Sequence, residues 1–183
     1  MNHLGTEILE TQRLILRKFN MEDAEPMYRN WASDESVVKY LTWPAHSSVE
    51  VSKKVLKDWT ENYTRKDYYQ WAIVLKENGF EPIGAIGVNT CDDNISMVHI
   101  GYCLGSRWWH KGIMSEALQS VMEFLFEKVE VNRIESRHDP RNPHSGDVMK
   151  KCGMKYEGTL RMADHNNQGI CDACYYGILA SER

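Results

Sequence analysis

Residues 107–126 of the chain read RWWHKGIMSEALQSVMEFLF, and this stretch holds the clearest helical pattern in the sequence. Apolar residues recur at intervals of three, four and seven positions, which predicts an amphipathic helix from Ile113 to about Lys128. Its apolar face consists of Met114, Ala117, Leu118, Val121, Met122, Leu125 and Phe126. A helix with one continuous apolar face lies against the core of a globular domain.

The residues that lead into this helix are basic, although the partial positive charge of a helix N-terminus favours acidic side chains. Arg107, His110 and Lys111 stand there, with no Ser, Thr, Asp or Asn near the boundary to cap the helix. An anion on the exposed backbone amides would satisfy them, and Gly112 would let it come close. The stretch therefore predicts a phosphate or pyrophosphate site, although a plain surface turn with solvated cations would carry the same residues.

The flanking sequence predicts a mixed α/β fold. We expect strands at residues 11–19, 69–76, 82–89, 95–104, 133–138, 154–160 and 170–179, and helices at residues 21–31, 48–63, 113–128 and 143–152. Asn20 and Ser48 are the expected N-caps, and Gly153 is the expected end of the last helix. The three strands between residues 69 and 104 form a meander, and the long helix after them indicates one parallel crossover. The predicted sheet is thus mostly antiparallel and flanked by helices, in a single domain spanning residues 1–183.

Composition narrows the class of protein. A length of 183 residues corresponds to about one domain. The formal net charge of −4 argues against a nucleic-acid partner bound through bulk positive charge. No apolar run approaches the ~20 residues of a membrane span, and no signal peptide is visible, so we expect a cytoplasmic protein without a membrane partner.

The five cysteines are odd in number and scattered, which fits reduced thiols. Cys171 and Cys174 form a C-x-x-C pair, but they fall on an expected strand. Residues three apart on a strand point to opposite faces, so we expect no metal site there.

Residues 100–118, IGYCLGSRWWHKGIMSEAL, resemble the acetyl-CoA segment of the GNAT acetyltransferases. More narrowly, they resemble the branch that includes the RimJ and RimL ribosomal-protein N-terminal acetyltransferases. Residues 11–17, 139–154 and 158–161 resemble other segments of that branch, in the same order along the chain. The resemblance covers nearly the whole chain. It implies the GNAT fold, acetyl-CoA as cofactor and an amine acceptor, and homodimers are common in the branch.

The same resemblance implies a set of cofactor-binding residues. The family pattern R/Q-x-x-G-x-G/A falls on residues 109–114, where His110 and Met114 replace the usual small residues and Trp109 replaces Arg or Gln. Residues 102–104 match the strand whose backbone pairs with the pantetheine arm. Lys111 and Arg107 are the further charge partners for the phosphates that the resemblance implies. The implied cofactor-binding residues are Tyr102, Cys103, Leu104, Trp109, His110, Lys111, Gly112, Ile113, Met114, Asn142 and Ser145.

Asn142 has two readings. Asn142 followed by Pro143 is the N-cap and first-position signature of a helix, which favours capping as its single role and makes Ser145 the third helical residue. In the family, this Asn also contacts the cofactor arm and the serine lies near the sulfur. The two roles can coexist, because a capping oxygen leaves the amide nitrogen free.

Acetyl transfer from a thioester requires a neutral amine, donors for the developing oxyanion and a proton for the departing thiolate. Ser145 is the predicted hydrogen-bond donor on the sulfur side. An α-amine with a pKa near 7.7–8.0 is about a tenth neutral at pH 7, so a weak base suffices for it. Asp164 is the predicted base, at a position where related enzymes place an acid. His138 and Asp139 are alternatives, and each of the three also reads as an ordinary polar residue of a loop or strand end.

The resemblance thus implies an acetyl-CoA-dependent N-acetyltransferase acting on a protein N-terminal α-amine or a small-molecule amine. Aromatic residues concentrate in the first half of the chain, where the family builds its acceptor pocket, and the lack of an acidic cluster there disfavours polyamines. Two alternatives stay open: a catalytically weak or inactive acyl-CoA-binding protein of the same fold, and a phosphate binder outside the family. Ser145 favours catalysis, because a pure binder needs no hydroxyl near the sulfur.

Overall fold

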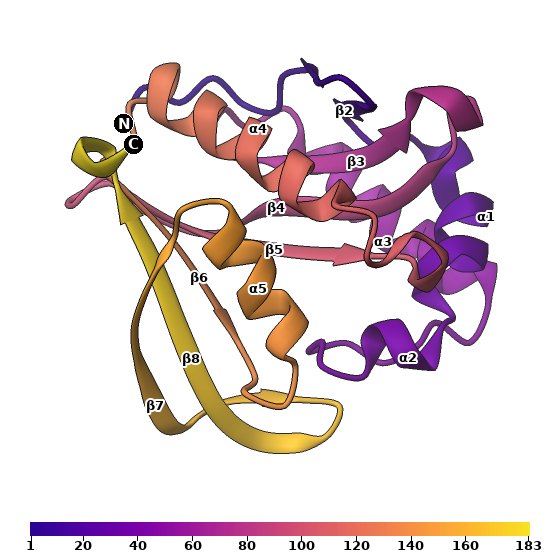
Figure 1. Cartoon of the computed structure of the whole chain (residues 1–183). Helices are drawn as coiled ribbons and strands as arrows, with labels where there is room; N and C mark the ends of the chain where they lie inside the picture. The colour runs from indigo at the N-terminus through magenta and orange to yellow at the C-terminus, as the bar shows by residue number, and fades with distance from the viewer.

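The long helix predicted around residue 113 lies along one face of a large sheet. In a computed structural model that describes residues 1–183 apart from the side chain of Asn78, this helix is α4 (Ile113–Glu127). It packs on an eight-stranded sheet of order β1-β2-β3-β4-β5-β6-β8-β7 (Figure 1). The strands are β1 (Leu9–Glu10), β2 (Leu14–Arg17), β3 (Gln70–Leu75), β4 (Pro82–Asp92), β5 (Met97–Leu104), β6 (Arg133–His138), β7 (Lys155–Asn166) and β8 (Gly169–Leu179).

The strand directions confirm the predicted mixture. Strands β5 and β6 are parallel, and the other paired strands of the sheet are antiparallel. Helix α4 makes the crossover between β5 and β6, as the order of elements predicted. The fold is therefore mixed α/β with a mostly antiparallel sheet.

Helices cover the two faces of the sheet unevenly. Helices α4 and α5 (Pro143–Lys151) lie on one face, and α1 (Ala24–Met27) and α3 (Val49–Asn62) gather at the other side, near β3 and β4 (Figure 1). The short α2 (Glu35–Val38) lies below them in this view, toward the lower end of α5. None of the helices in the described chain has the length and apolar character needed to cross a membrane.

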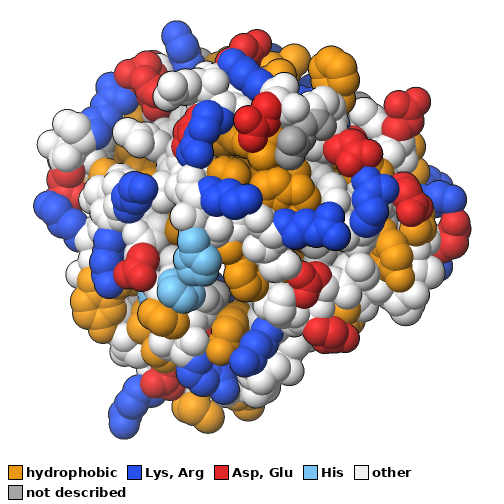
Figure 2. Space-filling model, turned by 45° about the vertical axis from the view of Figure 1, so that its right-hand side comes forward, with side chains coloured by type: hydrophobic (Ala, Val, Ile, Leu, Met, Phe, Trp, Pro, Cys, Tyr) orange, Lys and Arg blue, Asp and Glu red, His pale blue; other side chains and the backbone are white. Residues whose placement is uncertain are grey.

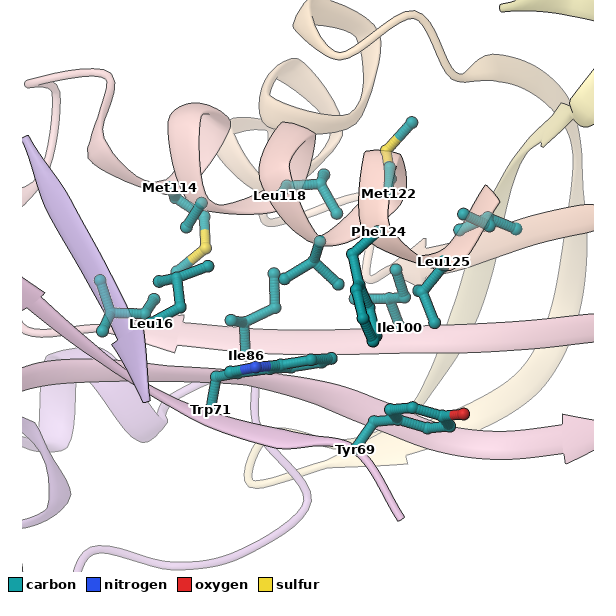
Figure 3. Packing of buried hydrophobic residues seen from close by; sticks show 14 of the residues in the cluster. Leu16, Tyr69, Trp71, Ile86, Ile100, Met114, Leu118, Met122, Phe124 and Leu125 are labelled. Carbon is teal, nitrogen blue, oxygen red and sulfur yellow. The ribbon is translucent and has the colours of Figure 1, made fainter. Parts of the chain in front are cut away.

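The main core lies between α4 and the strands beneath it. Figure 3 shows α4 side chains, among them Leu118 and Phe124, pointing down onto residues of β3, β4 and β5. The rings of Trp71 and Phe124 meet edge to face, with centroids 5.9 Å apart and an interplanar angle of 82°. The indole of fully buried Trp71 keeps its hydrogen bond by donating to the Glu7 carbonyl at 2.6 Å. This core fixes α4, and with it the start of the helix.

Some predicted elements are shorter or interrupted. The strand expected at residues 11–19 is confined to β2. Thr11 lies in a turn before it, where the Thr11 hydroxyl accepts a hydrogen bond from the Leu14 amide at 2.9 Å. The helix expected at residues 21–31 becomes a 3-10 turn (Met21–Asp23), then α1, then a π turn (Tyr28–Ala32). The expected N-cap is confirmed there: Asn20 accepts from the Glu22 amide at 2.8 Å, and Asp23 accepts from the Asn20 amide.

The helix expected at residues 48–63 is α3, but its details differ. Ser48 occupies the N-cap position without a side-chain hydrogen bond to the helix. The most buried residues of α3 are Ser52 and Leu56. Because Ser52 is polar, the pattern of apolar residues does not predict its burial. A 2.8 Å hydrogen bond with the His46 ring satisfies its hydroxyl in the interior. The short α2 was not predicted, because a single helical turn has no periodicity to detect.

We predict that Leu118→Ala lowers the free energy of unfolding by about 2–5 kcal/mol, since Leu118 is fully buried and its truncation leaves a cavity. Chemical denaturation measures the change. Gln119→Ala, at the next position on the exposed side of α4, is the matched control and should change stability little. Equal effects of the two substitutions would contradict the observed packing of α4.

Candidate active site

A cavity of about 390 Å³ opens between the end of β5 and the N-terminal ends of α4 and α5. It reaches from the start of α4 past α5 to the segment around α2. Residues from β5, the turn before α4, α4, α5 and the α2 segment line it: Val37, Tyr40, Leu41, Tyr102, Cys103, Leu104, Trp108, Trp109, His110, Gly112, Ile113, Met114, Ser115, Asn142, His144, Ser145, Asp147, Val148 and Lys151.

One wall of the cavity exists because two parallel strands separate. Strand β5 pairs with β6 only from Met97 to His99. The Ser136 hydroxyl holds the Ile100 carbonyl at 2.8 Å, and beyond it the described residues provide β5 with no strand partner on that side. Residues 102–104 therefore present a backbone edge without a strand partner to the cavity, where an extended ligand could pair, although the Leu104 carbonyl already accepts from the Trp109 indole.

The start of α4 forms a second wall. Gly112 is its N-cap residue, in the left-handed conformation with φ +73°, and no side chain in the described structure caps the helix. The first amides of α4 are thus without an intrahelical partner and belong to residues that line the cavity. A glycine is needed at this position because other residues are strained at positive φ. Both features agree with the predicted anion site.

Two cations lie next to this helix start. A Cβ atom built on Gly112 would lie 3.6 Å from Lys151 Nζ and 3.7 Å from an Arg13 guanidinium nitrogen. Arg13 is paired with Glu116 at 2.6 Å and also donates to the Lys111 carbonyl at 2.9 Å. Lys151 makes no ion pair with any described carboxylate, so its charge is available to a ligand. On the face shown in Figure 2, Lys and Arg side chains, with Asp and Glu side chains among them, lie around histidine and apolar side chains.

Sequence reasoning named other cations for this role. The Lys111 side chain does not line the cavity, and Arg107 lines a separate hollow with Arg29 and Glu81. Lys151 and Arg13 were missed because they come from α5 and from the turn before β2, far from Gly112 in the chain. The available signal for Lys151 was its place in the last turn of the nine-residue helix α5, which the sequence did predict.

His110 takes the place of a small residue at the cost of backbone strain. Its φ is +59°, in the region that glycine occupies without strain. The imidazole packs edge to face on that of His144, with ring centroids 5.0 Å apart. Both rings line the cavity. The side chain at position 110 therefore forms part of the wall and leaves the turn itself intact.

The remaining predicted residues of the turn also reach the cavity. Trp109 is anchored by its indole, which donates to the Leu104 carbonyl at 2.7 Å. Ile113 and Met114 are buried at the start of α4 and contribute to the lining, as do Cys103 and Leu104 from β5. Burial raises the pKa of the Cys103 thiol to about 12, so it is a neutral wall residue.

Asn142 stands at the N-cap position of α5, yet the capping role predicted for it is wrong. Its side chain makes no capping hydrogen bond, and Pro143 follows as the first helical residue. The backbone of Asn142 has φ −113° and ψ 66°, outside the extended region in which a capping side chain reaches back to the helix. The carboxamide is consequently free to serve the cavity that Asn142 lines.

Ser145 meets Tyr102 at the cavity wall. Tyr102 Oη donates to the Ser145 carbonyl oxygen at 2.9 Å, and Ser145 Oγ donates to Tyr102 Oη at 3.2 Å. Burial raises the pKa of the Tyr102 phenol well above its usual value, which keeps it neutral. The structure thus brings the predicted sulfur-side donor together with a second hydroxyl that sequence reasoning had assigned only a backbone role.

Asp164, the predicted base, does not line the cavity. Its carboxylate is paired with the Arg137 guanidinium, with Nε–Oδ2 2.6 Å. Burial alone would raise the pKa of Asp164, but the hydrogen bonds from Arg137 and the His165 amide outweigh it and lower the pKa. A carboxylate held in this way is a weak proton acceptor. Asp139, an alternative base, is buried and paired with Arg141, and hydrogen bonds from that guanidinium lower its pKa strongly.

His138, the other alternative, holds α5 in place. Its Nδ1 donates to the Asp139 carbonyl at 2.8 Å. Nε2 is buried and has no partner in the described structure. The ring presses on Gly146 so closely that a Cβ there would lie 2.5 Å from Nε2. Gly146 therefore allows α5 to approach β6, and this approach sets the position of Ser145.

The far end of the cavity is apolar. Val37, Tyr40 and Leu41 line it from α2 and the following turn. Asn167, in the turn between β7 and β8, fixes this segment: its side chain donates to the carbonyls of Val38 and Trp43, each at 2.8 Å. The turn between β7 and β8 therefore holds the α2 segment in place from outside the cavity.

Comparison with known proteins identifies the family. The sequence profile described as "Acetyltransferase (GNAT) domain" matches residues 13–155, which is most of the chain. The chain belongs to the GNAT acetyltransferase family. The fold and the family expected from the sequence are both confirmed.

Relatives of this GNAT protein include named N-acetyltransferases. The chain is 31% identical over 176 residues to "Uncharacterized N-acetyltransferase p20" of Bacillus licheniformis, covering 96% of this chain and 98% of that one. It is 25% identical over 153 residues to the "Ribosomal-protein-serine acetyltransferase" of Escherichia coli, covering 83% and 84%. The solved structure of RimL, a "Ribosomal L7/L12 alpha-N-protein acetyltransferase" in complex with coenzyme A, superposes with a TM-score of 0.84 at 21% identity, covering 94% and 98%.

We predict that Gly146→Ala lowers the free energy of unfolding by about 1–3 kcal/mol, because the new methyl group would overlap the His138 ring. This range is the net change, after the ~1 kcal/mol by which alanine is the better helix former. Chemical denaturation of Gly146→Ala, made in the wild-type and in the His138→Ala backgrounds, tests the contact. The cost should shrink once the imidazole is gone, and an unchanged cost would contradict the contact.

Proposed function

We propose that the protein transfers the acetyl group of acetyl-CoA to a primary amine, with a protein N-terminal α-amine as the favoured acceptor and a small-molecule amine as the other. The observation that carries the proposal is the meeting of three features in one cavity. These are the uncapped start of α4 beside Lys151, the free edge of β5, and the Tyr102–Ser145 pair. They suit a diphosphate, an extended amide arm and a sulfur atom respectively.

The residues present fit coenzyme A on these grounds. Helix N-termini bind phosphates through backbone amides, so the first amides of α4 and the Lys151 ammonium are the proposed diphosphate contacts. Residues 102–104 are the proposed backbone partners of the pantetheine amides, and the free Asn142 carboxamide adds a polar contact to that arm. His110 and Trp109 complete the wall around the phosphates.

The chemistry needs little from the protein on the leaving-group side. Acetyl-CoA supplies an activated acyl group whose thiol has a pKa of about 8.5, already a fair leaving group. A hydrogen bond from Ser145 to the sulfur is then sufficient, and proton transfer from Ser145 is unnecessary.

On the amine side, we propose direct attack by an amine that is already neutral. About a tenth of an α-amine is neutral at pH 7, whereas well under a thousandth of a lysine side chain is. Asp164 lies outside the cavity lining and is paired with Arg137, so the proposal gives this carboxylate no part in removing the proton. This requirement favours an N-terminal acceptor over lysine.

The acceptor end supports the same substrate class. Val37, Tyr40 and Leu41 give it an apolar lining, and the one described carboxylate that lines the cavity, Asp147, comes from α5 and is paired with Lys150 at 3.5 Å. The ammonium groups of a polyamine would find no charge partner among these three residues. A peptide that begins with a small uncharged residue needs no such partner. The relationship to ribosomal-protein acetyltransferases adds support for a protein N-terminus, and the five free cysteines fit a reducing, cytoplasmic setting.

We predict that Lys151→Ala weakens coenzyme A binding roughly fivefold, because one cation beside the proposed diphosphate position is lost. Isothermal titration calorimetry measures the dissociation constant. Lys150→Ala is the matched control, since the exposed Lys150 side chain pairs with Asp147 and does not line the cavity. A binding constant that responds equally to both substitutions would contradict the proposed diphosphate position.

We predict that thiol release in the presence of acetyl-CoA and short peptides rises with pH up to the pKa of the peptide α-amine, about 8. Asp164→Asn should leave this pH dependence unchanged, because the group that titrates is the peptide α-amine. A panel of peptides, monoamines and polyamines with thiol detection tests the proposal. Coenzyme A binding without acetylation of any amine would instead support an inactive acyl-CoA-binding protein.

A further inference from the structure

Tyr102 and Ser145 form a closed pair of hydroxyl groups. The phenol donates to the Ser145 carbonyl at 2.9 Å and accepts from the Ser145 hydroxyl at 3.2 Å. Both protons are therefore in use, and the Ser145 proton is directed at Tyr102 rather than at the cavity. A serine in this state cannot yet donate to a ligand atom.

The pair can reverse without moving a heavy atom. The distance of 3.2 Å between the two oxygens allows either of them to be the donor. If the phenol turns its proton from the Ser145 carbonyl to Ser145 Oγ, the serine proton is released toward the cavity. Burial keeps the phenol neutral, so it retains the proton that this reversal requires.

We propose that Tyr102 is a positioning residue that turns the Ser145 hydroxyl toward the sulfur of coenzyme A and strengthens it as a donor. The inference rests on the function proposed above. In a chain Tyr102 O–H to Ser145 O–H to sulfur, each hydrogen bond polarises the next, so the second hydroxyl increases the stabilisation of a negative sulfur. Phenylalanine at position 102 would leave Ser145 without this partner.

The proposed step balances without a proton leaving either hydroxyl. A bond forms between the amine nitrogen and the acetyl carbon, and the carbon–sulfur bond breaks with its electron pair remaining on sulfur. The amine passes one proton to solvent, and the thiolate takes one from solvent after the transfer. Tyr102 and Ser145 keep their protons throughout and stabilise the sulfur charge by hydrogen bonding.

The test measures the pKa of the coenzyme A thiol bound to the full chain, from the ultraviolet absorbance of its thiolate as pH is varied. We expect a value below the ~8.5 of a free thiol. Tyr102→Phe should raise it by about one pH unit, equivalent to a tenfold change in ionisation, and Ser145→Ala should do the same. The double variant should go no further than either single variant. Ser145→Thr, which keeps a hydroxyl, should retain the low value.

Kinetics with an acceptor amine provides a second readout. Tyr102→Phe should lower kcat about tenfold while the KM for acetyl-CoA changes less than about twofold, because the contact strengthens as charge develops on sulfur. Tyr156→Phe is the matched control: its exposed phenol bonds Thr159 at 2.7 Å, away from the cavity, and both readouts should stay unchanged.

The outcomes separate the two proposals. A wild-type protein that shows no calorimetric binding of coenzyme A refutes the proposed function. Binding with a thiol pKa that Tyr102→Phe leaves unchanged refutes the positioning role alone. So do effects of Tyr102→Phe and Ser145→Ala that add independently in the double variant.

Discussion

The separation of β5 from β6 after His99 is the constraint on which the site depends. Up to that residue the strands pair in parallel, and beyond it β5 keeps only β4 as a partner, so one backbone edge is free. Helix α4 is the crossover between these same strands, and its start is therefore held at the mouth of the opening. Helix α5 follows β6 and closes the other side. One topological feature thus supplies the free strand edge, the uncapped helix and the hydroxyl pair.

Packing gives this arrangement its rigidity. The apolar face of α4 is buried against β3, β4 and β5. The backbone amides of its first turn are the groups that remain without a hydrogen-bond partner. The His138 ring against Gly146 fixes the approach of α5 to β6, and Tyr102 ties α5 to β5. The strained conformation of His110 is held by the turn on one side and by the His144 ring on the other. The site is thus built on elements that the core already fixes.

Much of this was predictable from particular residues. The period of the apolar positions predicted α4, and the basic stretch ending in Gly112 predicted a helix start without a side-chain cap, at which we propose an anion site. Other features had no local signal. A single-turn helix such as α2 has no period, and a π turn inside an apolar helical pattern leaves the pattern unchanged. Two contacts arise only when α5 packs against the sheet: the approach of the Lys151 ammonium to Gly112, and the hydrogen bond between Tyr102 and Ser145. Asn142 satisfied the sequence rule for a cap, yet its backbone angles direct the side chain elsewhere.

The central claim is that the first amides of α4 bind the diphosphate of coenzyme A. Backbone amide resonances in a nuclear magnetic resonance titration with coenzyme A examine these groups one by one. The account predicts that Gly112, Ile113 and Met114 are among the amides that shift most, while amides at the opposite end of α4 stay in place. Saturating ligand that leaves the resonances at the start of α4 unmoved would contradict it.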